Sequence, residues 1–152
     1  MVEPHRRAEL VGNEALAGRL CEEASRAVRH GLPLTLLMFH LASPSDDEQS
    51  LGQVTRAAAL LARAVVRRDD VVGLLGAGAF AIVANATRKG AGTLAEHLGR
   101  HIAAFEFTGH DGPVPVELRW ALACLSDSET ASGLLAKARA AFQPASRGPR
   151  VP

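Results

Sequence analysis

The sequence predicts an α+β fold in which helices flank a mixed central sheet. Two observations carry this prediction. Apolar residues recur at helical spacing in four segments, and short apolar runs of strand length separate them. Two of these runs, residues 71–75 and 80–83, are joined by the small-residue bend 76–79, which is too short for anything but an antiparallel hairpin. The order helix, strand, helix, hairpin, helix, strand, helix is typical of one layered domain.

In the first half of the chain, segments with helical spacing alternate with apolar runs of strand length. A helix is expected over residues 13–30, with Asn13 as its N-cap. The following run at 34–41 is almost unbroken in its apolar character, which is typical of a strand that is covered on both faces. An alanine-rich helix is then expected over residues 51–66, before the hairpin.

The second half begins with a helix predicted over residues 87–104, in which Thr93 and Glu96 have the spacing of a capping box. Residues 105–107 are expected to form a short edge strand, and residues 114–124 a longer strand whose Trp120 is expected in the core.

The end of the chain is expected to leave the domain. Polar residues at 126–129 are predicted to cap a closing helix that ends at Phe142. We therefore expect one domain over residues 1–142 and a disordered tail over residues 143–152.

Composition excludes several classes of partner. A net charge of +1 on 152 residues provides no overall field for nucleic acid or for an acidic membrane surface. No apolar run is long enough to span a membrane and no signal peptide is evident, so a cytoplasmic protein is expected. Cys21 and Cys124 lack metal-ligand spacing, and both are expected to be buried thiols.

Five short motifs occur in an order and spacing that together point to one family. They are Arg-His-Gly-Leu-Pro-Leu at 29–34, Arg-Arg-Asp-Asp at 67–70, the bend 75–80, Trp-Ala-Leu-Ala at 120–123, and Leu-Leu-Ala-Lys-Ala at 134–138. From about residue 10 to residue 142, the chain resembles the GGDEF domain of diguanylate cyclases. The resemblance implies a role in bacterial-type signal transduction.

Active members of that family condense two GTP molecules into cyclic di-GMP, using carboxylates that hold metal ions against the triphosphate. The signature turn is vestigial here, because Gly78 and Ala79 occupy the positions of its two acids. The family's metal-binding aspartate falls on His40, and imidazole is a poor ligand for Mg²⁺. The positions of this turn are Gly76, Ala77, Gly78, Ala79 and Phe80. The resemblance therefore implies a degenerate domain that is not an enzyme and has no catalytic residue, metal or cofactor.

Arg67 and Asp70 match the family's inhibitory Arg-x-x-Asp motif, which binds cyclic di-GMP. A guanidinium can donate two parallel hydrogen bonds to guanine or phosphate, and a carboxylate can accept from guanine. The resemblance thus implies a cyclic di-GMP receptor, with a second arginine from Arg63, Arg88 or Arg100. A structural role is the alternative, since arginine favours helix ends and aspartate favours turns.

Two further interpretations remain open. In the first, the chain is a nucleotide-independent interaction module. Its face around His40 and residues 76–79 would then dock a partner signalling protein or a second copy of the chain. His97 and His101 lie one helical turn apart and have the spacing to share a metal ion, but no third ligand is evident, so an exposed polar face is favoured.

Overall fold

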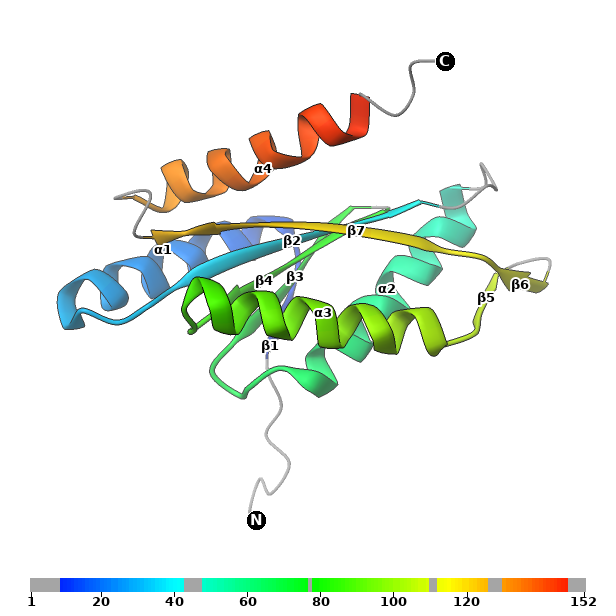
Figure 1. The fold of residues 1–152 in the computed structure, drawn as a ribbon, viewed down its shortest axis with the longest axis horizontal. Helices are drawn as coiled ribbons and strands as arrows, with labels where there is room; N and C mark the ends of the chain where they lie inside the picture. The colour runs from blue at the N-terminus through cyan, green and yellow to red at the C-terminus, as the bar shows by residue number, and fades with distance from the viewer. Residues whose placement is uncertain (1–8, 43–47, 77, 110–111, 126–129, 148–152) are drawn as a thin grey trace, which may run out of the picture.

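The computed structural model describes residues 9–42, 48–76, 78–109, 112–125 and 130–147. Within them strands and helices alternate along most of the chain (Figure 1). The elements in chain order are β1 (Glu9–Val11), α1 (Asn13–His30), β2 (Thr35–Ala42), α2 (Glu48–Val65), β3 (Val71–Gly76), β4 (Ala79–Ala84), α3 (Arg88–Ala104), β5 (Phe107–Gly109), β6 (Gly112–Val114), β7 (Glu117–Cys124) and α4 (Ala131–Arg147). None of the described helices is long and apolar enough to cross a membrane.

Five strands form one sheet in the order β1-β3-β4-β2-β7. The first pair is parallel and the other three pairs are antiparallel, so the sheet is mixed. The hairpin β3–β4 lies inside the sheet rather than at its edge, because β1 and β2 pair with its outer sides. The predicted α+β architecture, with its mixed sheet and antiparallel central hairpin, is confirmed.

Helices cover both faces of this sheet, so the core has two layers. Side chains alternate along β2: Leu37 and Phe39 pack with α2 and α3, while Leu36 and Met38 pack with α1 and α4. In Figure 1, α3 runs along one face and α4 lies across the other. Cover on both faces explains why the β2 sequence is apolar almost throughout.

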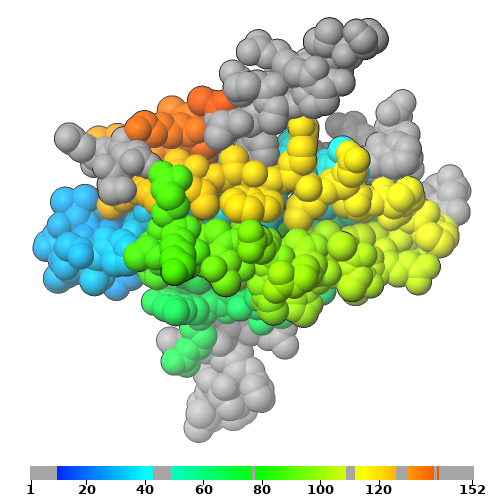
Figure 2. All heavy atoms as spheres, in the orientation of Figure 1, coloured from blue at the N-terminus to red at the C-terminus, as the bar shows by residue number. Residues whose placement is uncertain are grey.

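The strand β7 forms one edge of the sheet. Figure 2 shows its side chains (yellow) at the surface between α3 (green) and α4 (orange). Trp120, which we expected in the core, keeps 36% of its surface exposed because no further strand lies beyond β7. Cys124 is buried as expected, but Cys21 is exposed on α1, so the expectation of two buried thiols is wrong for Cys21.

Two predicted helix caps differ from those observed. Gly12, with an extended backbone, is the N-cap of α1, so Asn13 lies inside the helix. The hydroxyl of Thr87 accepts a hydrogen bond from the backbone N–H of Gly90 at 3.1 Å and caps α3. Thr93 lies within α3, where its hydroxyl donates to the carbonyl of Lys89, so no capping box begins there.

The segments around α4 and β5 also differ from expectation. β5 begins at Phe107 and pairs with β6 in a separate two-stranded sheet, instead of extending the main sheet. The helix α4 continues to Arg147, five residues beyond its predicted end at Phe142. The predicted cap at residues 126–129, and residues 148–152 of the predicted disordered tail, lie outside the described residues.

Candidate functional site

The signature turn is held by backbone hydrogen bonds to β2 and α2. Gly76 and Gly78 have positive φ angles of 131° and 92°, a region that glycine enters far more readily than other residues. The carbonyl of Gly78 accepts a hydrogen bond from the N–H of Leu41 at 2.7 Å, and its own N–H donates to the hydroxyl of Thr55 at 2.8 Å. Ala77 lies outside the described residues. The turn therefore keeps its place without an acidic side chain.

Gly78 also lacks room for a side chain. It is buried, and a β-carbon built on it would lie 3.2 Å from the carbonyl oxygen of Leu41 and 3.4 Å from Leu51. A carboxylate at this position would need β2 or α2 to move. Packing and the positive φ therefore both disfavour a side chain at Gly78.

Phe80 follows the signature turn on β4 and packs against the neighbouring strand β2. It is fully buried, and its ring stacks on Phe39 with centroids 4.8 Å apart and planes 9° apart. This stack joins β4 to the neighbouring β2, where the two residues are directly paired. Phe80 therefore contributes to the core and is not available to a ligand.

His40, which the resemblance places at the family's metal-binding position, lies on β2 between the strands β4 and β7. Its cross-strand partners are Ala79 on β4 and Arg119 on β7. Burial lowers the pKa of His40, and the positive charge of Arg119 lowers it further. His40 is therefore neutral at pH 7, and the charged group beside it is a cation.

One carboxylate does lie near this face. Glu117 on β7 pairs with Ala42, the last residue of β2. Sequence reasoning missed both Glu117 and Arg119, because only the register of β2 and β7 brings them here. Across the described ranges, no group of three or more histidine, cysteine, aspartate or glutamate side chains is placed to hold a metal ion.

The Arg-x-x-Asp motif forms the tight turn between α2 and β3, at the other end of β3. Asp70 is only 3% exposed. One carboxylate oxygen accepts from the backbone N–H of Arg67 at 3.1 Å, and the other accepts from Asn85, from its backbone N–H at 3.0 Å and its side-chain amide at 3.4 Å. Burial raises the pKa of Asp70, although these hydrogen bonds act in the opposite direction. The carboxylate thus already binds the protein's own donors.

Arg67 differs from Asp70, because it is exposed. Arg26 on α1 is bonded into this network, because its guanidinium donates to the side-chain oxygen of Asn85 at 3.3 Å and to Glu23 at 3.1 Å. The asparagine also donates to the carbonyl of Asp69 at 3.0 Å. Sequence reasoning missed Arg26 and Asn85, since 59 positions separate them in the chain.

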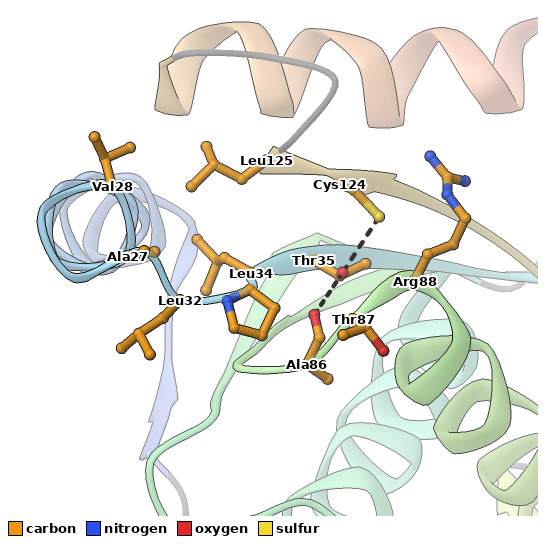
Figure 3. Close-up of a pocket in the computed structure, with 12 residues that line it drawn as sticks. Ala27, Val28, Leu32, Leu34, Thr35, Ala86, Thr87, Arg88, Cys124 and Leu125 are labelled. Carbon is orange, nitrogen blue, oxygen red and sulfur yellow. Dashed lines mark hydrogen bonds between the residues drawn. The ribbon is translucent and has the colours of Figure 1, made fainter.

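The three arginines named from the sequence lie on α2 and α3. Arg63 is in the last turn of α2, and Arg100 is exposed on α3. Arg88 lines a cavity of about 440 Å³ where the end of α1, the start of α3 and the end of β7 meet (Figure 3). At its base the hydroxyl of Thr35 donates to the carbonyl of Ala86 at 2.8 Å. The cavity is at the opposite end of β2 from the signature turn, and its lining is mostly apolar.

Comparison with known proteins places this geometry among solved folds. No protein-family model matches the sequence, and no curated protein matches it. The GGDEF domain of YfiN from Pseudomonas aeruginosa is similar in structure, with a TM-score of 0.73 at 22% identity over 90% of each chain. The GGDEF domain of DgcB from Caulobacter crescentus, solved in complex with c-di-GMP, has a TM-score of 0.71 at 16% identity, over 99% of this chain and 93% of that one.

A third similar structure is the diguanylate cyclase SiaD from Pseudomonas aeruginosa, solved with its activator SiaC. It has a TM-score of 0.75 at 21% identity, over 90% of this chain and 55% of SiaD. At these identities the comparison establishes the fold. The chain therefore has the fold of the GGDEF domain, as its sequence motifs predicted.

Proposed function

We propose that this chain is a GGDEF-fold domain that binds a signalling ligand without catalysing its synthesis. The observation that carries the proposal is the chemistry at the former metal positions: His40 is flanked by Ala79 and by the cation Arg119. Phosphoryl transfer to a ribose hydroxyl needs oxygen ligands that hold Mg²⁺ against the triphosphate. A neutral imidazole beside a guanidinium is poorly suited to that task.

Packing at the signature turn supports the same conclusion. Because a side chain at Gly78 would press on the backbone carbonyl of Leu41 at a positive φ, an acid at this position is disfavoured. Among the residues that the structure describes, Glu117 supplies one carboxylate near the face, whereas two-metal phosphoryl transfer relies on several oxygen ligands. Incubation of the purified chain with GTP and Mg²⁺ is therefore expected to leave the GTP unchanged.

The ligand we propose is cyclic di-GMP, bound through the Arg-x-x-Asp turn. Arg67 presents an exposed guanidinium, which is suited to guanine edges and phosphate. Asp70 holds the turn that carries Arg67, since its carboxylate bonds the backbone of Arg67 and Asn85. Arg26, linked to the same asparagine, is the arginine we propose as the second contact.

Calorimetry with cyclic di-GMP tests this binding directly. Wild-type protein is expected to bind saturably, and Arg67→Ala to abolish binding or weaken it by about tenfold or more, as expected for the loss of a bidentate contact worth about 1.5–3 kcal/mol. Arg68→Ala is the matched control, because Arg68 is also exposed but lies outside the motif. Absence of heat with the wild-type protein, or equal affinity in the two variants, would refute the receptor proposal.

A nucleotide-independent interaction module is the second candidate function. It is favoured by apolar side chains left at the surface, with Phe105 46% and Trp120 36% exposed. SiaD, a protein with this fold, was solved together with a protein activator. Under this proposal the chain associates with a partner signalling protein or with itself through the face around His40 and Ala79.

Sedimentation of the purified chain distinguishes self-association from a monomeric receptor. If the face around His40 mediates a dimer, the wild-type protein sediments as a concentration-dependent dimer and Ala79→Glu sediments as a monomer. The control is Ala103→Glu, on an exposed part of α3. A wild-type protein that remains monomeric at all concentrations would rule out the dimer and leave only a different partner protein for this face.

A further inference from the structure

Two exposed histidines of α3 are placed against one another. His97 and His101 are one turn apart, and their Nε2 atoms are 3.2 Å apart. The ring centroids are 4.6 Å apart and the planes are inclined by 74°. A neutral imidazole can bind a metal through either ring nitrogen, and here the two Nε2 atoms face each other.

The separation of the two nitrogens fits a shared metal ion. With bonds of about 2.05 Å from metal to imidazole, two nitrogens are about 2.9 Å apart at a right angle and about 3.35 Å apart at a tetrahedral angle. The observed 3.2 Å lies between these two values. No rearrangement of the helix is needed for both rings to reach one ion.

The helix also holds the pair in place. The opposite side of α3 is buried in the core through Ala95, Leu98 and Ile102. The backbone that carries the histidines is therefore fixed at its i, i+4 spacing, while their exposure leaves the remaining coordination positions open to water. Such preorganisation reduces the entropy lost when a ligand binds.

We infer that His97 and His101 bind one divalent transition-metal ion through their Nε2 atoms. The class is set by the donors: imidazole suits Cu²⁺, Ni²⁺ and Zn²⁺, whereas Mg²⁺ and Ca²⁺ require oxygen. In the metal-free pair the Nε2–H of one ring donates to the Nε2 of the other. When the ion binds, the donor ring carries its proton on Nδ1 instead, so that both Nε2 lone pairs are free to bind the metal. This site is separate from the signature turn and does not depend on the proposed function.

Calorimetric titration of the chain, prepared without an affinity tag, tests the site with the metal ions themselves. Cu²⁺ and Ni²⁺ are expected to bind at one ion per chain, and Mg²⁺ to give no heat. His97→Gln and His101→Gln are each expected to weaken binding by at least about tenfold, since even changes outside the ligand sphere cost about 10–100-fold. Glutamine is chosen because it preserves a polar, exposed helix surface.

The control variant is His30→Gln, which alters an exposed histidine on α1 and is expected to bind metal like the wild type. A second measurement is thermal unfolding, in which Ni²⁺ is expected to raise the melting temperature of the wild type and of His30→Gln but not of His97→Gln. The inference is overturned if neither Cu²⁺ nor Ni²⁺ binds saturably, or if both α3 variants bind as tightly as the wild type.

Discussion

Strand β3 has a turn at each end, and the two turns are held by different groups. The turn before it depends on the side chain of Asp70, which binds the backbone of Arg67 and Asn85. The turn after it depends on the backbone of Gly78, which bonds to Leu41 and Thr55. The bonds that hold the signature turn involve no acidic side chain, whereas the bonds that hold the Arg-x-x-Asp turn include the carboxylate of Asp70.

This difference changes how the motifs are interpreted. An aspartate that is needed for folding remains in the sequence whether or not a ligand binds beside it, so Asp70 alone says little about function. The exposed Arg67 has no such structural duty and is the informative residue of the pair. In the signature turn, by contrast, no acidic side chain takes part in the bonds that hold Gly78, so the residues at positions 78 and 79 are informative about function.

The largest effect is expected from Asp70→Ala. The substitution removes three hydrogen bonds and leaves the N–H groups of Arg67 and Asn85 without their acceptor, which is expected to lower the free energy of unfolding by about 2–4 kcal/mol. Urea unfolding measures this change. Asp69→Ala is the control, since Asp69 is exposed and its bond to Asn85 comes from the backbone carbonyl. A loss as small as that of the control would mean that the carboxylate does not hold the turn.

The next effect is expected from Gly78→Ala. A methyl group there meets the carbonyl of Leu41 at a φ of 92°, and the strain is expected to cost about 1–3 kcal/mol. Gly92→Ala is the matched control, because Gly92 lies in α3 with open space around its α-carbon. That variant is expected to gain about 0.5–1 kcal/mol from its helix propensity. Equal stability of the two variants would show that the signature turn tolerates side chains.

A smaller effect is expected from pH acting on His40. Its pKa is lowered in the folded protein, so the unfolded chain takes up a proton first as the pH falls below 6.5. Protonation of this group in the unfolded chain therefore lowers the free energy of unfolding on acidification. Above pH 6.5 His40 causes no such loss of stability. The stability of the wild type relative to His40→Gln is expected to fall between pH 7.5 and pH 5, in unfolding curves measured in parallel. An increase over that range would contradict the burial of a neutral imidazole.

The smallest effect on stability is expected from Arg67→Ala, within about 0.5 kcal/mol, because its side chain is exposed. The same variant is expected to lose cyclic di-GMP binding. A large loss of stability would assign the arginine, like the aspartate, to the fold, and would remove the reason to regard Arg67 as a ligand contact.

Most of the fold was predictable because the chain is periodic where it is buried. The apolar runs at residues 71–75 and 80–83 predict the hairpin that is observed. The β2 segment is apolar because both of its faces are covered. β1 was missed, since its three residues carry no periodicity and it pairs in parallel with β3, from which α1, β2 and α2 separate it in the chain. Trp120 was placed in the core because the sequence does not indicate that β7 is an edge strand.

The site was predictable only where residues adjacent in sequence make it. The positions of the signature turn and of Arg67 and Asp70 followed from short motifs. The groups that decide their chemistry did not: Arg119 reaches His40 through strand register, and Asn85 reaches Asp70 across the hairpin. Such contacts depend on pairing between distant segments, which local patterns do not encode.

The central claim is that the chain binds a ligand without turning over nucleotide, and a product assay tests it most directly. The purified protein is incubated with GTP and Mg²⁺ over a range of protein concentrations, and cyclic di-GMP is measured by mass spectrometry. An active GGDEF domain assayed in parallel verifies the conditions. We expect no product above the protein-free blank; cyclic di-GMP that increases with the concentration of this chain would contradict the account.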